Sequence, residues 1–377
     1  MESLDKHLLR SKYILYSVAW FLSLCAFISS YMALIVNLEK FDKESLKANS
    51  IAPVEVNRDI KGSEQNIPKV VERKNEFTLS DKVTNIAILG LDERAKEYDG
   101  EWARADSMMI LTIDEKNKKI KLSSILRDCY VDVLEYGMIV KDKINHSFAY
   151  GASEEYSESQ NPNRAYHAGG LRSIKVLNDN FDLDIKDYVI INFSSFQNII
   201  DKIGGVTINL TEDEVYEINC AMGESNVYGK YIKVSEGAGL KVLNGKQALA
   251  YARDRTNGGD SDRARRQRNV IQSIYKSLKK LNPIQLTAAI KELNGMVKTN
   301  LTCIQIVSLS TKVLFNDMSL VNTRFPVDNN WYGDRINEVC YDIIDDEELN
   351  IRQMKDFIFK DILPDVAEDE ETTTAPQ

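Results

Sequence analysis

The hydrophobic pattern of the chain opens with one long apolar segment. Tyr13–Val36 carries no charged residue, and a helix of this length spans about 36 Å at 1.5 Å per residue, enough to cross a bilayer. Three basic residues, Lys6, Arg10 and Lys12, precede it, which by the positive-inside rule places the N-terminus in the cytoplasm. A cleaved signal peptide is the alternative, although its apolar region would be shorter and would end in a small-x-small cleavage site. We predict an uncleaved transmembrane anchor in a bacterial cell membrane, with the rest of the chain outside the cytoplasm.

Beyond this segment the pattern changes from a polar stretch to alternating strands and helices. Residues 37–81 show no sustained periodicity and are expected to form a linker. Strands are predicted at Val83–Leu91, Ser107–Ile113, Lys119–Ile125, Tyr188–Asn192 and Val206–Leu210. Helices are predicted at Leu171–Phe181, Ser194–Ile203, Asp262–Lys280, Ile284–Val297 and Ile304–Phe315. This alternation predicts an α/β fold in which helices pack on a mixed sheet.

The same patterns divide the chain into successive parts. The C-terminal stretch is acidic and rich in threonine, and it lacks the apolar residues that a packed core requires. The predicted parts are a cytoplasmic N-terminus (1–12), a transmembrane anchor (13–36), an extracytoplasmic linker (37–81), a globular domain (82–363) and a disordered acidic tail (364–377).

Charge and composition narrow the chemistry. The formal net charge of -9 argues against a nucleic-acid binder. Within Tyr251–Arg268, however, six arginines accompany three aspartates, and such a basic island in an acidic chain indicates an anionic ligand. The five cysteines include no CxxC pair, so we expect mostly free thiols rather than a zinc cage. HExxH, GxSxG and P-loop motifs are all missing, which leaves arginines and a metal to handle phosphate.

Charged side chains lie at the ends of the first three predicted strands. Asp92 follows the first strand, Arg104 and Asp106 precede the second, and Arg127 and Asp128 follow the third. If neighbouring strands are antiparallel, all of these groups gather at one edge of the sheet. Two close carboxylates repel each other, and a hard cation such as Mg²⁺ or Mn²⁺ relieves that repulsion. The alternative is structural: one aspartate caps a turn and the other merely precedes a strand.

A second cluster contains Arg253 and Arg255. In an extended segment their side chains point the same way, because side-chain direction repeats every two residues. Two guanidinium groups on one face would clamp a diphosphate. A solvated strand with salt bridges is the alternative interpretation.

The third cluster opens the helix predicted from Asp262, with Asp260 or Ser261 as its cap. Arg263, Arg266 and Gln267 share a stripe that becomes apolar further along, so we expect the first turn to face a pocket. The helix N-terminus adds partial positive charge. The two remaining arginines of this turn, Arg265 and Arg268, lie off the stripe and are predicted to face solvent.

These motifs, in this order, resemble the LytR-CpsA-Psr family of cell-envelope phosphotransferases. The matching segments are NIAILGLD (Asn85–Asp92), RADSMM (Arg104–Met109), SSILRD (Ser123–Asp128), DKIN (Asp142–Asn145), Gly169-Gly170, Phe193, GGV (Gly204–Val206), LNGKQALAYARDR (Leu243–Arg255) and DSDRARRQR (Asp260–Arg268). Two departures are small: Leu126 stands where the family usually has proline, and Ala105 replaces the usual serine or threonine.

The resemblance implies an α/β/α sandwich with a mixed central sheet and a hydrophobic polyprenyl-binding pocket, making residues 82–363 a catalytic domain. It implies transfer of a glycan phosphate (teichoic acid, capsular or another wall polymer) from undecaprenyl diphosphate to peptidoglycan or a similar acceptor. By motif position, Asp92 and Asp106 would hold Mg²⁺ or Mn²⁺. The implied catalytic residues are Arg104, Asp106, Arg127, Arg253, Arg255 and Asp260. The implied diphosphate-binding residues are Arg104, Arg127, Lys143, Arg253, Arg255, Arg263 and Gln267.

Two other functions use the same residues. A pyrophosphatase acting on polyprenyl diphosphate would replace the acceptor hydroxyl by water. A non-catalytic binder or regulator would only sense envelope precursors. The predicted partners are a polyprenyl-diphosphate-linked glycan, a peptidoglycan-like acceptor and membrane lipid, and no nucleic acid, because the arginines would lie outside the cell.

Overall fold

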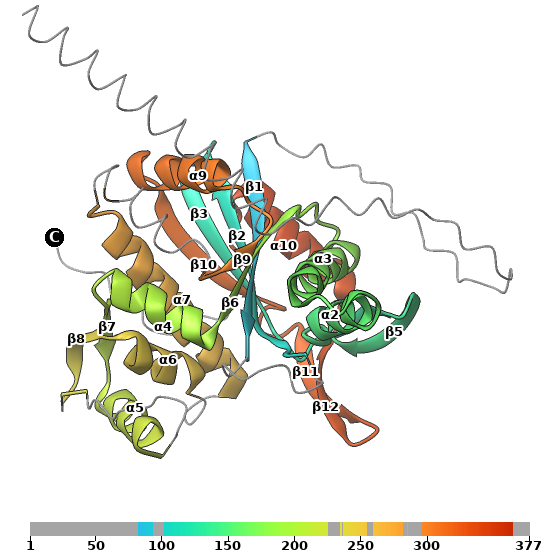
Figure 1. The fold of residues 1–377 in the computed structure, drawn as a ribbon, viewed down its shortest axis with the longest axis horizontal. Coiled ribbons are helices and arrows are strands. Elements are labelled where there is room, and N and C mark those ends of the chain that lie inside the picture. The colour runs from blue at the N-terminus through green and yellow to red at the C-terminus, as the bar shows by residue number, and fades with distance from the viewer. Residues whose placement is uncertain are drawn as a thin grey trace, which may run out of the picture. The chain divides into compact units, whose positions relative to one another are not determined.

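A mixed sheet forms the centre of the structure (Figure 1). The structure is a computed structural model, and it describes residues 82–92, 102–224, 234–235, 237–254, 259–281, 285 and 296–364. The strand order is β10-β3-β2-β1-β6-β9. The strands are β1 (Val83–Leu91), β2 (Ala105–Asp114), β3 (Lys119–Ile125), β6 (Asp187–Asn192), β9 (Lys298–Thr299) and β10 (Ser319–Phe325). The predicted α/β class with a mixed sheet is therefore confirmed.

Strand direction within this sheet follows from the connections. β2 runs antiparallel to both β1 and β3, as expected from the short turn that joins β2 to β3. β6 is parallel to β1, and β10 is parallel to β3; long connections that contain both helices and strands join these pairs, as parallel pairing requires. The first, third and fifth predicted strands have the bounds that the sequence indicated, whereas β2 is longer at both ends.

Helices cover both faces of the sheet (Figure 1). On one face lie α2 (His146–Ser159) and α3 (Pro162–Phe181), where Phe148 and Phe181 pack against Ala87 and Leu89 of β1. The opposite face carries α4 (Phe193–Lys202), α6 (Gly245–Arg253) and α7 (Gly259–Leu278). Burial of apolar side chains on both faces explains the near-continuous hydrophobic pattern of the central strands.

Further elements surround the sheet, and of these the sequence predicted only the strand Val206–Leu210 and the helix at Ile304–Phe315. Three two-stranded ribbons flank the sheet: β4 (Tyr130–Glu135) with β5 (Met138–Lys143), β7 (Val206–Leu210) with β8 (Gly239–Leu243), and β11 (Trp331–Ile336) with β12 (Val339–Ile344). The remaining elements are α5 (Glu212–Glu224), α9 (Cys303–Phe315), α10 (Glu347–Lys355) and the π-helical turn η1 (Asp356–Lys360). Helix α9 confirms the prediction for that segment, while most of the helix predicted at Ile284–Val297 lies outside the described residues.

The prediction of an extended segment at Arg253 is wrong. Arg253 is the last residue of α6, which begins after Asn244 with a capping box that also involves Gln247. That local signal, followed by an alanine-rich stretch, favours a helix over a strand. Helix α7 also begins earlier than predicted, so Asp260 and Ser261 lie within its first turn and not at its cap.

The helices of the described residues were compared with the length and polarity that a membrane span requires. Among them, every helix is too short or too polar to span a bilayer, and the predicted anchor and linker lie outside them. Cys129, Cys220, Cys303 and Cys340 are free thiols, as predicted.

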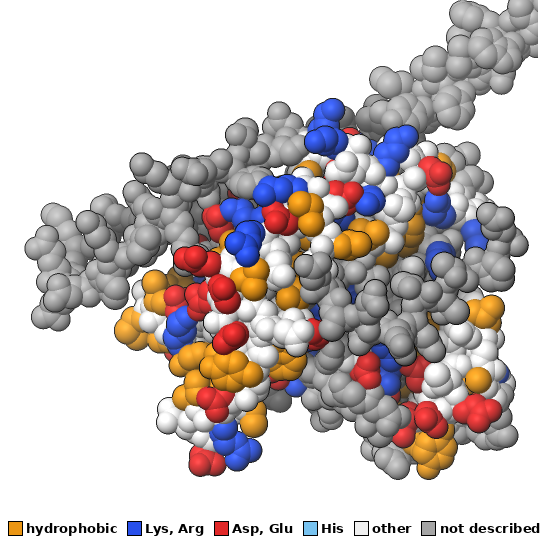
Figure 2. Space-filling model, turned by 180° about the vertical axis from the view of Figure 1, so that it is seen from behind, with side chains coloured by type: hydrophobic (Ala, Val, Ile, Leu, Met, Phe, Trp, Pro, Cys, Tyr) orange, Lys and Arg blue, Asp and Glu red, His pale blue; other side chains and the backbone are white. Residues whose placement is uncertain are grey.

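Hydrophobic side chains gather on the side of the molecule where Figure 1 places β5 and β12 (Figure 2). Exposed apolar residues on these two ribbons are Tyr136, Met138, Ile139, Tyr332 and Val339.

Candidate functional site

The first three strands bring the predicted charged residues to one edge of the sheet. Leu91 of β1 lies opposite Ala105 of β2, and Met108 of β2 lies opposite Ile125 of β3. The residues that follow β1 and β3 and those that precede β2 therefore share an edge, as the antiparallel geometry requires. The backbone N–H of Asp92 donates to the carbonyl oxygen of Arg104 at 3.4 Å. The sequence predicted this convergence correctly.

A cavity of about 1030 Å³ opens beside this edge. Its wall between the sheet and the helices is largely apolar and includes Ile88, Met109, Phe196, Ile199, Ile271 and Ile274. Its polar end is lined by Asp92, Asp106, Ser107, Arg127, Asn192, Arg253, Asp254, Arg263 and Gln267. A long apolar space that ends in guanidinium and carboxylate groups suits an amphiphile with an anionic head group.

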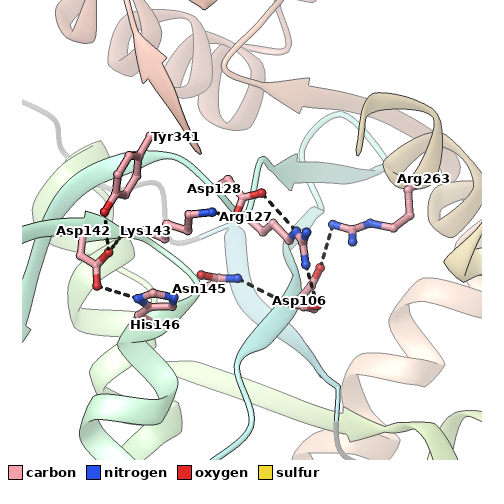
Figure 3. Close-up of polar contacts among 9 residues, drawn as sticks. All are labelled: Asp106, Arg127, Asp128, Asp142, Lys143, Asn145, His146, Arg263 and Tyr341. Atoms are coloured by element: carbon pink, nitrogen blue, oxygen red, sulfur yellow. Dashed lines mark hydrogen bonds and ion pairs between the residues drawn. The ribbon is translucent and has the colours of Figure 1, made fainter. Parts of the chain in front are cut away.

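Asp106 is the centre of the polar network (Figure 3). Its carboxylate accepts hydrogen bonds from Arg127 Nη1 at 2.6 Å and from Asn145 Nδ2 at 3.1 Å. Its backbone carbonyl oxygen accepts from Arg263 Nη2 at 3.2 Å. Asn145 is the last residue of the DKIN segment (Asp142–Asn145), and its contact with Asp106 was not predicted from the sequence. The network fixes the orientation of Asp106 and of two cavity arginines, which pre-organises them for a ligand.

Lys143 lies on the other side of Arg127, away from the cavity wall (Figure 3). Its Nζ is 2.9 Å from one carboxylate oxygen of Asp128, and the other oxygen of Asp128 is 3.4 Å from Arg127 Nε. The Lys143 ammonium also lies over the ring of Tyr341, 5.5 Å from its centroid. Lys143 therefore supports Arg127 through Asp128, and the structure does not place it among the residues that line the cavity.

Next to Lys143, Asp142 forms a compact hydrogen-bonded group. His146 Nδ1 lies 2.6 Å from its carboxylate, and the Tyr150 hydroxyl donates to the same oxygen at 2.5 Å. Burial alone would raise the pKa of Asp142, but the hydrogen bonds from His146, Tyr150 and the Lys143 backbone outweigh it and lower the pKa to about 2. Asp142 is therefore ionised at neutral pH and anchors the start of α2.

Arg253 approaches the cavity from the end of α6. Its guanidinium carbon lies 4.4 Å from the centroid of the Phe193 ring, and Nη2 is 3.9 Å from the Asp92 carboxylate. Stacking on an aromatic face holds a guanidinium in place while leaving its N–H groups in plane and able to donate. Phe193 was part of a matched motif, but its stacking role depends on a tertiary contact that the sequence does not reveal.

Helix α7 sorts its polar residues differently from the prediction. Arg263 and Gln267 line the cavity, and Gln267 accepts a hydrogen bond from the Ser107 hydroxyl at 2.9 Å. Arg266, predicted to join them, is buried and pairs with Glu214 at 3.4 Å and Asp254 at 3.2 Å. Successive helical residues are rotated by about 100°, so Arg266 faces neighbours that Gln267 does not reach.

The other two arginines of this turn also separate. Arg265 is exposed, as predicted, and pairs with Asp262 at 3.2 Å. The prediction that Arg268 faces solvent is wrong. Burial, followed by the charges of Arg324 and Arg265, lowers the pKa of Arg268 to about 10, because helix α7 turns this side chain towards β3 and β10.

The remaining candidates are either absent from the described cavity lining or lie outside the described residues. Arg104 is exposed and is not among the described residues that line the cavity. Arg255 and the side chain of Asp260 lie outside the described part of the chain. The metal candidates Asp92 and Asp106 both line the cavity. In the described residues no group of three or more His, Cys, Asp and Glu side chains could hold an ion, so a metal here would need ligands from a substrate or water.

Comparison with known proteins gives a consistent result. The model of the LytR_cpsA_psr family matches residues 51–356. The teichoic acid transferase TagU of Oceanobacillus iheyensis, named a polyisoprenyl-teichoic acid–peptidoglycan transferase, is 30% identical over 279 residues, which are 73% of this chain and 76% of that protein. The regulatory protein MsrR of Staphylococcus aureus is 32% identical over 226 residues, or 59% of this chain and 58% of that protein.

Solved structures share the fold. The LytR-CPS2A-psr family protein YwtF (TagT) of Bacillus subtilis, solved with bound octaprenyl pyrophosphate, has a TM-score of 0.53 at 22% identity. The match covers 77% of this chain and 95% of that chain. At this level of identity the similarity establishes the α/β fold with its mixed sheet.

Proposed function

The chain belongs to the LytR_cpsA_psr family, and from that membership we propose that it transfers a glycan phosphate from a polyprenyl diphosphate to an acceptor hydroxyl. The acceptor is peptidoglycan or a similar envelope polymer. One observation carries the proposal: a single cavity combines a long apolar wall with a polar end of arginines and aspartates. Such a cavity matches a lipid chain at one end and a diphosphate at the other. The names of TagU and of the octaprenyl pyrophosphate complex of TagT agree with this chemistry.

Arginines hold the diphosphate in the proposed reaction. Arg127, Arg253 and Arg263 all line the polar end of the cavity and supply N–H donors in fixed planes, which suits bidentate contact with phosphate oxygens. Arg104 and Arg255 belong to the same set by their positions in the motifs. By their positions in the motifs, Gln267 and Asp260 would orient the arginines at the start of α7.

The donor set also fits a divalent cation. Asp92 and Asp106 offer oxygen ligands at the same edge, and Mg²⁺ is commonly held by one or two carboxylates together with water and substrate phosphates. Mn²⁺ shares this preference. When bound, the ion would neutralise charge on the phosphates during transfer.

The reaction needs little covalent assistance from the protein. The acceptor oxygen forms a bond to the phosphorus that carries the glycan, and the bridging P–O bond breaks. Polyprenyl phosphate leaves, and the arginines stabilise the negative charge that develops on it. The hydroxyl proton passes to a carboxylate, for which Asp106 and Asp260 are the candidates. No nucleotide is required, because the diphosphate linkage supplies the driving force.

The function belongs at the membrane. An N-terminal anchor at residues 13–36 would keep the catalytic domain beside a lipid-linked substrate on the outer side of the cell membrane. The polar linker would give the domain enough reach to approach both the bilayer and the wall polymer.

A product assay tests the proposal. The purified protein is incubated with a polyprenyl-diphosphate-linked glycan, peptidoglycan oligomers and Mg²⁺, and the products are analysed by mass spectrometry. We expect a glycan phosphate joined to the acceptor together with free polyprenyl phosphate. Arg127→Ala and Arg253→Ala should each lower the rate by about 10² to 10³, the usual cost of removing one transition-state donor.

The other functions give different products. A pyrophosphatase would release glycan phosphate without using the acceptor. A binder would leave the substrate intact. Either result, obtained with a chain that is folded by circular dichroism, would reject the transferase.

A further inference from the structure

Two arginines outside the diphosphate-binding set, one half-buried and one buried, lie side by side between α7 and the sheet. Arg268 belongs to α7, and Arg324 belongs to β10 and is only 7% exposed. The Nη1 atom of each is buried, and neither finds a hydrogen-bond partner among the described residues. Buried polar atoms are nearly always hydrogen-bonded, so two such atoms on neighbouring cations require an explanation.

The strand register places this pair beside the cavity. Arg324 lies opposite Ser124 of β3, and Ser124 lies opposite Met109 of β2. Directly opposed residues project from the same face of a sheet, and Met109 lines the cavity. On the helix, Ile271 lies three residues after Arg268, on the neighbouring part of the helix surface, and lines the cavity. The arginine pair therefore borders the cavity on its β10 side, where α7 packs against β3 and β10 (Figure 1).

Among the charged groups that act on Arg268, positive charge predominates. Arg324 donates through Nη2 to Asp328, and its guanidinium lies 5.5 Å from the centroid of the Trp331 ring. The charges acting on Arg268 are those of Arg324, Arg265 and Asp328, of which only Asp328 is negative. The one carboxylate that acts on Arg268 is therefore already paired with Arg324, and it is 37% exposed.

Arg266 is a buried arginine of the same helix that has a structural role, and its partners differ from those of Arg268 and Arg324. It pairs with two carboxylates, Glu214 and Asp254, and donates a further hydrogen bond to the backbone oxygen of Asp254 at 3.0 Å. Burying a cation without such partners is unfavourable. The contrast indicates that, among the described residues, Arg268 has fewer negative partners than Arg266, so that a further anion would be favourable beside it.

We propose that Arg268, Arg324 and Ser124 form a second oxyanion subsite beside the cavity, selective for a phosphate group. The Ser124 hydroxyl is buried and has no hydrogen-bond partner in the described structure, so it can donate to the same ligand. Two guanidinium groups and a hydroxyl match the several oxygens of a tetrahedral phosphate. The subsite is separate from Arg127 and Arg253 and does not depend on the function proposed for them.

Phosphate binding is measured in a background that removes the proposed diphosphate clamp. Full-length protein carrying Arg127→Ala and Arg253→Ala is titrated with inorganic phosphate at constant ionic strength, with chloride as the reference anion. Binding is followed by calorimetry and by the melting temperature. We expect phosphate to bind and to raise the melting temperature in this background, because a ligand that binds only the native state stabilises it.

Arg268→Met is then added to that background. It removes the charge but keeps an unbranched side chain. We expect phosphate binding to weaken by about tenfold or more, the usual worth of a charge-assisted hydrogen bond. Without phosphate, the melting temperature should stay the same or rise, since the variant removes repulsion with Arg324. Arg265→Met, the same change at an exposed arginine of the same helix, is the matched control. Arg265 acts on Arg268 through its charge alone, so phosphate binding should change far less than in the Arg268→Met variant.

Several results would overturn the subsite. One is the absence of phosphate binding in the Arg127→Ala and Arg253→Ala background. Another is unchanged affinity in the Arg268→Met variant, or a lower melting temperature with no change in affinity, which would make Arg268 structural. If Arg268→Met does not fold, Arg324→Lys is tested instead. This variant keeps the positive charge but loses the Nη1 donor. Unchanged phosphate affinity in Arg324→Lys would also overturn the subsite.

A competition experiment identifies the source of the phosphate. Inorganic phosphate is titrated into otherwise unaltered protein that has been saturated with a polyprenyl-diphosphate-linked glycan. If the subsite takes a phosphate of the glycan, the lipid-linked substrate should exclude inorganic phosphate. If it takes free phosphate, both should bind at once and Arg268→Met should abolish only the phosphate signal. Phosphate binding that is excluded by the substrate yet insensitive to Arg268→Met would contradict the proposal.

Discussion

At the scale of single residues, charge pairing separates the roles of similar side chains. Asp106 contacts Arg127 and Asn145 at the cavity, whereas Asp128 faces Lys143 behind it. Asp106 and Asp128 both lie at the same sheet edge, yet only Asp106 lines the cavity. The surroundings of a carboxylate, rather than its position in a motif, therefore decide whether it can reach a substrate or a metal.

Asp106→Asn tests the metal part of the proposal. The variant keeps the size of the side chain and an oxygen that can accept from Arg127, but it loses the charge that favours a divalent cation. We expect turnover to fall by about 10² or more and the Mg²⁺ concentration for half-maximal rate to rise. The measurement is the transfer rate as a function of Mg²⁺.

Asp128→Asn provides the control, because Asp128 lies away from the cavity wall. Its metal response should match that of the unaltered protein. If the unaltered protein keeps its full transfer rate after a chelator has removed Mg²⁺, the metal has no part in the reaction.

At the scale of elements, α7 links the site to the rest of the fold. One face lines the cavity through Arg263 and Gln267. The next face holds Arg266 against Glu214 of α5 and Asp254 after α6. A third face carries Arg268 on the side where α7 packs against β3 and β10. Because these faces contact different neighbours, a substitution on each face should have a different effect.

Arg266→Met should strongly destabilise the fold. The change leaves Glu214 and Asp254 without their buried partner, and breaking a buried ion pair in this way usually costs about 3 to 5 kcal/mol. Arg265→Met removes an exposed pair with Asp262 and a pair with Glu214 at 3.6 Å; because Arg265 is exposed and Glu214 keeps Arg266, the change should cost about 0 to 1 kcal/mol. Denaturant unfolding followed by tryptophan fluorescence measures both values. Equal effects for the two variants would show that the Arg266 ion pairs add no stability.

At the scale of the whole molecule, the proposed function requires both the predicted membrane anchor and the cavity that holds the lipid-linked substrate. The apolar wall can hold a polyprenyl chain only if the domain stays near the bilayer that supplies it. The predicted anchor at residues 13–36 and the linker at residues 37–81 would set that distance. In the proposed function, a chain with a net charge of -9 binds a phosphorylated lipid through a local arginine cluster and not through its overall charge.

Membrane attachment is tested by fractionation and surface proteolysis. We expect the full chain to sediment with membranes and its C-terminal domain to be digested by protease added outside spheroplasts. Deletion of residues 13–36 should release the protein from the membrane and leave it inside the cell. A C-terminal domain that is protected in intact spheroplasts of the full chain would reverse the predicted topology.

The amino-acid sequence by itself determined the elements whose signals are local. The apolar runs of β1 and β3, and the short turn between β2 and β3, specified an antiparallel meander with the charged residues Asp92, Asp106 and Arg127 at one edge. The 3.6-residue period identified α7 and α9. These features depend on side chains close together in sequence, so pattern alone is sufficient.

Only the tertiary structure decided which polar side chains meet. Arg266 and Arg268 differ from Gln267 by one position, yet they face ion pairs or the sheet instead of the cavity wall. Asn145 reaches Asp106 across 39 positions of sequence. A rotation of about 100° per helical residue is small enough that the packing of neighbouring elements selects the partner. Sequence therefore specified the elements and the site edge, and packing selected the side chains that complete the site.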